Sequence, residues 1–184
     1  VANEATPSVY GTRIGTTTPR NYAPAAVDPA GSVSIINMNT RTVTATAGFA
    51  GVTQTGANIR TNTGMDFEPE YIAVNGAGTK AYVTLQEANA IGVLDLNTNT
   101  FEKVVGLGAK DFSVAGNQID PLNNGVVSFI SANVKGLYMP DGIATYESNG
   151  NTYLVMANEG DYREDDVDRS SASTLGAVAP LNNL

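Results

Sequence analysis

Apolar residues in this chain occur in short runs that alternate with polar residues, and clusters of Gly, Asn, Thr and Pro separate the runs. Alternation with a period of two indicates half-buried β-strands, and polar clusters between such runs indicate turns. No stretch has the 3.6-residue period of an amphipathic helix of useful length. The pattern therefore predicts an all-β protein, with strands expected at residues 31–38, 42–46, 71–74, 81–85, 91–96, 101–105, 142–146 and 152–157.

The stretches between these strands have the composition of loops. Residues 1–30 are rich in Pro, Thr and Gly and predict irregular structure, and residues 48–65 predict a long polar loop. Residues 106–138 predict mostly loop, with one short strand at 126–130. After Asp161 the sequence continues as an acidic run, 163–168, and a tail of small residues.

An internal repeat organises these strands. The stretch from Met139 to Asp161 repeats the stretch from Glu68 to Glu87, so that Pro140 aligns with Pro69 and Glu159 with Glu87. A second alignment places residues 33–37 on residues 91–95, which makes Asn3-Glu4 a third copy of the Gln86-Glu87 corner. Repeated units of four short strands are typical of a β-propeller, in which each blade buries its faces against its neighbours.

The repeat predicts a β-propeller segment of about two blades, built from four-stranded antiparallel meanders with long loops. We expect residues 1–65 to hold the outer strands of one blade, 66–138 a complete blade with its loop, and 139–184 the inner strands of the next blade with the acidic tail. A propeller closes with roughly four to eight blades. The partners of this segment are then the remaining blades of its own chain or other copies. A self-contained open β-sandwich is the alternative fold.

Composition limits the chemistry that the chain can carry. Its 184 residues have a formal net charge of −8, which disfavours nucleic-acid binding. There is no Cys and no His, so disulfides, thiolate or imidazole metal ligands and a histidine base are excluded. A bound metal must be held by oxygen, which favours Ca²⁺ or Mg²⁺. No run of about 18 apolar residues occurs, so no membrane span is predicted.

Carboxylates recur at the two corners of the repeated hairpin. In a propeller the loop that enters the innermost strand and the loop that leaves the second strand lie on one face. Like charges brought together raise one another's pKa or require a cation, and Ca²⁺ takes six to eight oxygen ligands. The innermost strands line the central channel of a propeller, so we expect Glu4 and six further carboxylates to converge on one end of that channel. The sequence therefore predicts a calcium site there, with these candidate ligands: Glu159, Asp161, Asp141, Glu87, Glu70 and Glu68.

A structural role for the same residues stays open. Asp and Glu in turns often accept hydrogen bonds from main-chain N–H groups and have no other function. The run from Asp161 to Asp168 lacks the alternating oxygen ligands and central Gly of an EF-hand loop, so a solvated acidic loop is its simpler interpretation.

Several segments together resemble the choice-of-anchor I family, a group of secreted or surface-attached bacterial β-propellers similar to YVTN-type and phytase-like propellers. The segments are residues 66–74, 81–87, 108–111, 138–144 and 157–161. Some members are labelled alkaline-phosphatase-like. The resemblance implies an extracellular or cell-surface protein that depends on Ca²⁺. Two departures from the family pattern are Ala5, where Gly commonly follows Asn-Glu, and the segment 162–164.

Three functions follow from these observations. The first is a surface-binding module with an acidic, calcium-binding face. The second is a Ca²⁺-dependent phosphomonoesterase, in which the metal polarises a phosphoryl oxygen and activates water. The third is a structural subunit of an extracellular assembly, because an open blade edge can pair with another strand. The sequence leaves the choice between enzyme and binding module open, since few cationic groups are available to a phosphoryl group.

Overall fold

The computed structural model describes residues 1–5, 27, 29–60, 67–122 and 124–160, and within them every regular element is a β-strand. The chain divides into two compact units, one of residues 1–108 and 137–165 and the other of residues 109–136 and 166–184. The strands are β1 (Ala2–Asn3), β2 (Ser32–Asn37), β3 (Thr42–Gly48), β4 (Thr53–Ala57), β5 (Pro69–Val74), β6 (Lys80–Leu85), β7 (Ala90–Asp95), β8 (Thr100–Leu107), β9 (Ala109–Asp111), β10 (Lys135–Leu137), β11 (Pro140–Ser148) and β12 (Asn151–Asn158).

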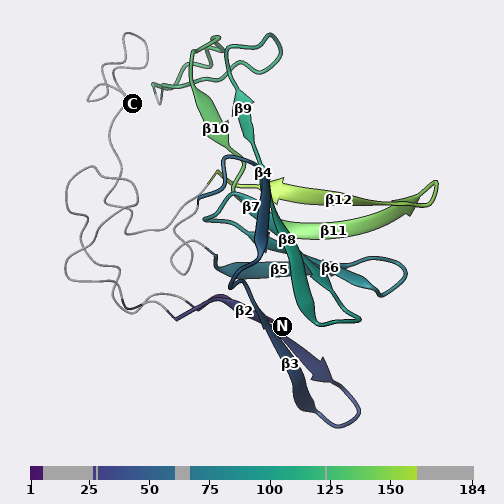
Figure 1. The fold of residues 1–184 in the computed structure, drawn as a ribbon. Helices are drawn as coiled ribbons and strands as arrows, with labels where there is room; N and C mark the ends of the chain where they lie inside the picture. The colour runs from purple at the N-terminus through teal and green to yellow at the C-terminus, as the bar shows by residue number, and fades with distance from the viewer. Residues whose placement is uncertain (6–26, 28, 61–66, 123, 161–184) are drawn as a thin grey trace. The chain divides into compact units, whose positions relative to one another are not determined.

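The first unit is built on a five-stranded sheet with the order β4-β8-β7-β6-β5 (Figure 1). Strands β5 to β8 form the expected antiparallel meander. The expectation of a loop over residues 48–65 was wrong, because Thr53–Ala57 forms β4 and pairs in parallel with β8. All five residues of β4 are exposed, so their sequence lacks the apolar alternation of a half-buried strand, and only main-chain pairing with β8 makes the segment a strand.

Hairpins β2–β3 and β7–β8 have the same turn. Its first residue, Asn37 or Asp95, accepts two main-chain N–H groups with its side-chain Oδ1: those of Asn39 and Thr40 at 2.9 and 3.3 Å, or of Asn97 and Thr98 at 2.8 and 3.1 Å. Arg41 and Asn99 both have φ of 57° in these turns. Such side-chain-capped turns form locally, which explains why the sequence repeat is reproduced in the structure.

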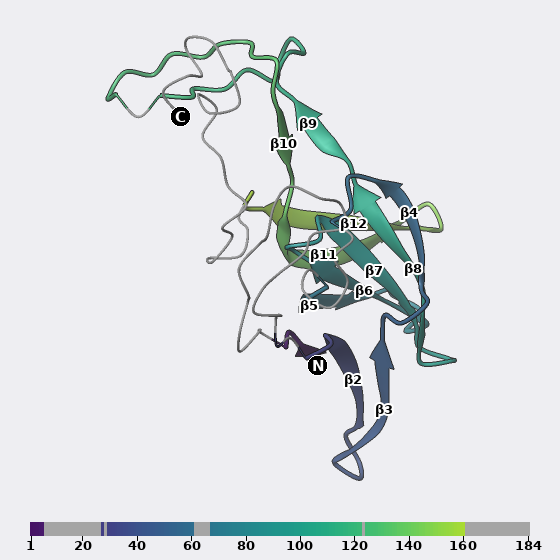
Figure 2. The same cartoon turned by 60° about the vertical axis from the view of Figure 1, so that its left-hand side comes forward.

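The other hairpin of the repeat is also reproduced. In β5–β6 and in β11–β12 the pairing is irregular directly after the initial proline, between Pro69 and Ile72 and between Pro140 and Ile143. Figure 2 shows β11 and β12 as a separate two-stranded sheet beside the five-stranded one. The described part is thus all-β and consistent with a partial propeller-like segment, and none of its sheets closes into a barrel.

The core of the first unit lies between β2–β3 and one face of the five-stranded sheet. Phe49, directly after β3, stacks on Phe101 of β8 with ring centroids 4.2 Å apart, and both rings are buried. Gly92 makes room for them, since a Cβ there would lie 2.7 Å from Cε1 of Phe101. The core residues are Val33, Ala47, Phe49, Phe67, Ala81, Val83, Leu85, Ala88, Ala90, Leu94, Phe101 and Val104.

Two further expectations were wrong in part. Residues 1–30 were expected to be irregular, yet Ala2 and Asn3 form β1 and pair with Val33 and Ser32 of β2. In the second unit the expected strand at 126–130 is reduced to a single bridge between Ile119 and Ile130. That segment lacks a continuous partner among the described residues, and apolar alternation without a partner does not make a strand. The described residues contain no helix that is long and apolar enough to cross a membrane.

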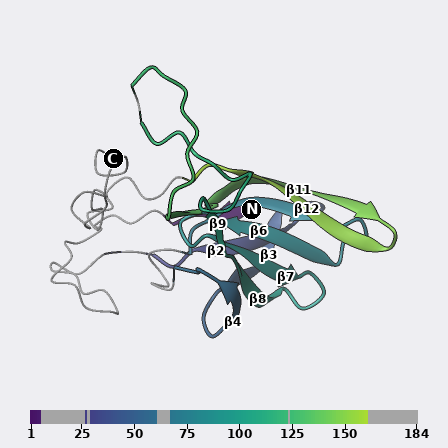
Figure 3. The ribbon, with the colours of Figure 1, turned by 90° about the horizontal axis from the view of Figure 1, so that it is seen from above.

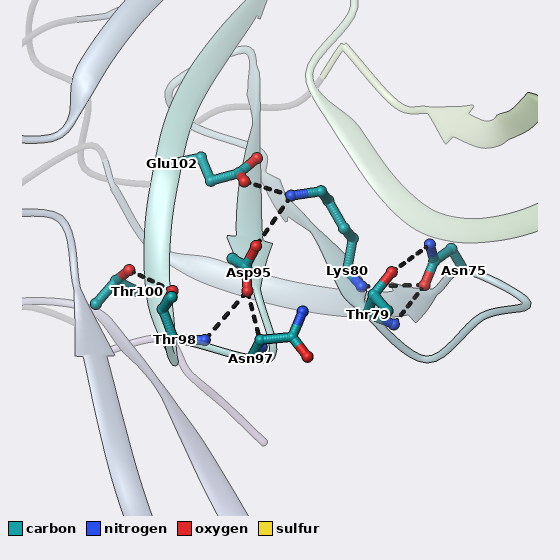
Figure 4. Close-up of polar contacts among 8 residues, drawn as sticks. All are labelled: Asn75, Thr79, Lys80, Asp95, Asn97, Thr98, Thr100 and Glu102. Carbon is teal, nitrogen blue, oxygen red and sulfur yellow. Dashed lines mark hydrogen bonds and ion pairs between the residues drawn. The ribbon is translucent and has the colours of Figure 1, made fainter.

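An ion-pair network joins three neighbouring strands on the surface of the sheet (Figure 4). Nζ of Lys80 on β6 lies 3.2 Å from Oδ2 of Asp95 on β7 and also binds Glu102 on β8. Hydrogen bonds from the main-chain N–H groups of Thr98 and Asn97, followed by the Lys80 contact, lower the pKa of Asp95 to about 2. The hydrogen bond from Lys80 to Glu102 is the main cause that raises the pKa of Lys80.

Two substitutions of Asp95 distinguish the stability contributed by the turn from the stability contributed by the ion pair. Asp95→Asn should keep the turn, because Asn37 caps the equivalent turn with an amide oxygen. Asp95→Ala removes both interactions and should lower the melting temperature further than Asp95→Asn does. Because the folded-state pKa of Asp95 is depressed, its contribution is present at neutral pH and is lost as the pH falls towards about 2. Equal melting temperatures for the two variants would contradict a role for the turn.

Candidate functional site

Four of the predicted site residues interact electrostatically in the first unit. Burial is the main cause that raises the pKa of Glu70 from its ordinary 4.5 to about 8. The charges of Glu87 and Asp141, a hydrogen bond with the Asp141 side chain and the charge of Glu4 raise it further. These residues come from β5, from the turn between β6 and β7, from β11 and from the segment after β1. We call Glu4, Glu70, Glu87 and Asp141 the carboxylate cluster.

The remaining candidates lie in different environments. Glu68 directly precedes β5 and is buried, with 4% of its surface exposed. Glu159 follows β12 and is exposed, and its Oε2 accepts a hydrogen bond of 3.1 Å from Nε2 of the buried Gln86. The main-chain N–H of Glu159 donates to the carbonyl of Met139 at 3.1 Å, which closes the second corner of the repeat. Asp161 lies outside the described residues.

Sequence reasoning missed Asn89, which organises the corner next to the carboxylate cluster. Its side chain is completely buried and makes four hydrogen bonds. Nδ2 donates to the carbonyls of Asn58 and Gly108 at 3.1 and 2.9 Å. Oδ1 accepts the main-chain N–H groups of Tyr138 and Met139 at 2.9 and 3.1 Å. One side chain therefore joins three segments that are distant in sequence.

Asn89 also connects the two repeats that carry the cluster. It lies two residues after Glu87 in the turn between β6 and β7, and it binds the chain just before Pro140 and Asp141. Its φ of 53° lies in the left-handed region, which Asn tolerates better than most residues. That tolerance was the only available sequence signal, and it indicates a turn rather than a buried hydrogen-bonding centre.

The chemistry of the cluster suits a hard cation. Its side chains are all carboxylates, the ligands that Ca²⁺ prefers, and their mutual repulsion is relieved by either a proton or a cation. The part of the chain that the structure describes contains no group of three or more acidic side chains already arranged to hold a metal ion. Without a cation, the raised pKa of Glu70 leaves its carboxyl mostly protonated at neutral pH.

The fold and its corners define an all-β, propeller-like repeat segment with acidic residues where its hairpins begin and end. The family comparison is consistent with this class, since the model of the choice-of-anchor I domain matches residues 1–183. The chain belongs to the choice-of-anchor I family. Choice-of-anchor domains are typically found in cell-surface or extracellular proteins, which indicates a surface anchoring or binding module. A search of curated proteins found no match to this sequence.

Proposed function

We propose that the chain is a calcium-dependent binding module of an extracellular or cell-surface protein. Membership of the choice-of-anchor I family over nearly the whole sequence supports the surface role. The observation that supports the calcium dependence is that Glu87, Asp141 and Glu4 all act on the partly buried Glu70, whose pKa is raised to about 8 first by burial and then by these carboxylates.

In this proposal Ca²⁺ takes the place of the proton on Glu70. At neutral pH the cluster holds a proton because Glu70 is partly buried and because other carboxylates lie near it. A divalent cation compensates more negative charge than one proton and recruits additional oxygen ligands. Glu70, Asp141 and Glu87 are the ligands that this proposal favours. Glu68 and Glu159 lie at corners of the same repeated hairpins and are further candidates. Calcium then ties the start of β11 to the turn between β6 and β7.

Thermal unfolding with calcium or with EGTA tests this proposal. Calcium at about 100 times its Kd should raise the melting temperature by roughly 5 to 10 °C, because ligand binding to the folded state adds stability. Glu70→Gln and Asp141→Asn should each remove most of that increase. Asp120→Asn is the matched control, since Asp120 is exposed in the second unit and its replacement changes the net charge equally. It should leave the increase intact.

Three results would count against calcium binding at the cluster. One is a melting temperature that does not respond to calcium. Another is a response that Glu70→Gln and Asp141→Asn leave unchanged. The third is an equal loss of the response in Asp120→Asn, which would point to general screening of a chain with a net charge of −8.

A further inference from the structure

A groove of about 380 Å³ lies in the first unit between the five-stranded sheet and β12. Leu154 and Met156 of β12 form one wall. The floor comes from β6, β7 and β8, with the apolar residues Ile91 and Val93 on β7 and Val105 and Leu107 on β8. The polar lining residues of the same groove are Lys80, Tyr82, Glu102 and Lys103. Contacts of β11 with β5 and β6 place the hairpin β11–β12 beside the five-stranded sheet, as can be followed in Figure 3.

The floor of the groove repeats a surface that already has a partner in this chain. Val33, Ala47 and Phe49, from β2, from β3 and from the residue after β3, belong to one buried core with residues of β6, β7 and β8, and Ile35 packs against this core. In the repeat these four residues, taken in chain order, correspond to the four apolar floor residues. The strand registers support the correspondence, because Val33 pairs with Ala47 as Ile91 pairs with Val105.

The partner of that surface is repeated as well. The residues of β7–β8 that meet Phe49 and its neighbours include the cross-strand pair Leu94 and Phe101, which are 0% and 7% exposed. The corresponding pair in β2–β3 is Ile36 and Val43, which also face one another across the hairpin after the same register shift. Ile36 and Val43 are 38% and 57% exposed. The described residues thus carry a second copy of the apolar residues of each half of one interface, and these two copies do not pack on each other.

We propose that the groove binds the hairpin β2–β3 of a second copy of this chain, through Ile36 and Val43. The contact would resemble the packing within each copy, where Phe49 after β3 stacks on Phe101 of β8. The groove and the hairpin are different surfaces of the described part of each copy, so the contact is heterologous and closes into a ring or continues as a chain of copies.

Solution mass of the 184-residue chain tests the proposal. Light scattering or sedimentation should show species of at least twice the 19.1 kDa chain mass as concentration rises. Ile36→Lys combined with Val43→Lys should abolish them, and since both side chains are exposed, the fold should persist. The matched control is Met38→Lys with Asn39→Lys, two lysines added at exposed positions in the turn of the same hairpin. A chain of 19.1 kDa at every concentration, or equal loss in the control, overturns the proposal.

A second arm concerns the edge of β2. If the hairpin of a second copy enters the groove, its β2 lies beside β12 as β7 lies beside β6. Residues 1–3 lie along this same edge, where Ala2 pairs with Val33 and the Val1 carbonyl accepts the N–H of Ser34 at 2.9 Å. Residues 1–3 would compete with β12 of the other copy for this edge. Deleting them should therefore strengthen self-association. Weaker association of the shortened chain would contradict this arrangement.

Cross-linking tests the predicted contact directly, because the chain has no cysteine. Phe101 corresponds to Val43 in the repeat, and Phe49 corresponds to Leu107. Because Phe49 and Phe101 stack on each other, Val43 of one copy is expected to contact Leu107 of the other. Chains carrying Val43→Cys and chains carrying Leu107→Cys are mixed with oxidised glutathione as the oxidant. Both thiols lose their protons and electrons to it as the intermolecular disulfide forms. The mixture should yield far more mixed cross-links than same-variant cross-links. Equal yields, or none, would overturn the proposal whatever the outcome of the calcium experiment.

Discussion

Replacing Asn89 with leucine is expected to lower the free energy of unfolding by roughly 3 to 5 kcal/mol, because buried main-chain groups lose their partners. The carbonyls of Asn58 and Gly108 and the N–H groups of Tyr138 and Met139 all bind the Asn89 side chain. Leucine also tolerates the φ of 53° less well than asparagine. Urea denaturation at pH 7 measures the loss from the shift of the midpoint.

Asn99→Leu is the matched control for this prediction. Asn99 has φ of 57°, close to that of Asn89, but lies in the surface turn between β7 and β8. Its replacement should cost only the backbone strain, about 1 kcal/mol. Asn89→Asp keeps the acceptor for Tyr138 and Met139 but buries a carboxylate oxygen against the carbonyls of Asn58 and Gly108, so it should also be strongly destabilising. Equal effects of Asn89→Leu and Asn99→Leu would show that the four hydrogen bonds contribute little.

Replacing Glu70 with glutamine is expected to flatten the pH dependence of stability in calcium-free buffer. The folded-state pKa of Glu70 is about 8, against an ordinary 4.5. Between these values the folded state binds the Glu70 proton and the unfolded state does not, so stability falls as the pH rises through this window and levels off above about 8. Glu70 is partly exposed, and solvent screening limits the total change to roughly 1 to 2 kcal/mol.

Denaturation midpoints measured from pH 5 to pH 9 with EGTA test the Glu70 prediction. Glu70→Gln should be more stable than the unaltered chain at pH 9 and about equally stable at pH 5, because glutamine carries no charge next to Glu87 and Asp141. Asp120→Asn should keep the original slope, since Asp120 is exposed and belongs to the other unit. A Glu70→Gln chain with the original slope would show that other groups cause the pH dependence.

Local features of the fold could be predicted well from the sequence. Hairpins β2–β3, β5–β6, β7–β8 and β11–β12 were expected because strand alternation and turn residues act over a few positions. The repeat also placed Glu70 and Asp141 where the hairpins begin and Glu87 where one of them ends, and in the structure these residues lie at the start of β5, at the start of β11 and in the turn after β6. Cation binding by these residues stays a prediction. The side chains of Asn37 and Asp95 determine their turns without help from the rest of the molecule.

Tertiary structure decided the features that depend on distant partners. β4 exists only because β8 lies beside it, and its exposed residues carry no apolar pattern. Asn89 joins segments on either side of it in the sequence. One asparagine in a turn gives no sequence signal for such a role, because its hydrogen-bond partners are distant in the chain.

The contrast between two equivalent pairs shows the physical reason most clearly. Leu94 and Phe101 are buried, whereas Ile36 and Val43 occupy the same places in an equivalent hairpin and are exposed. The sequence by itself determined the strands, the turns and the repeat, since hydrogen bonding and side-chain alternation within a hairpin are local. Burial, the raised pKa of Glu70 and the identity of each packing partner depend on what lies across the sheet, so only the tertiary structure decided them.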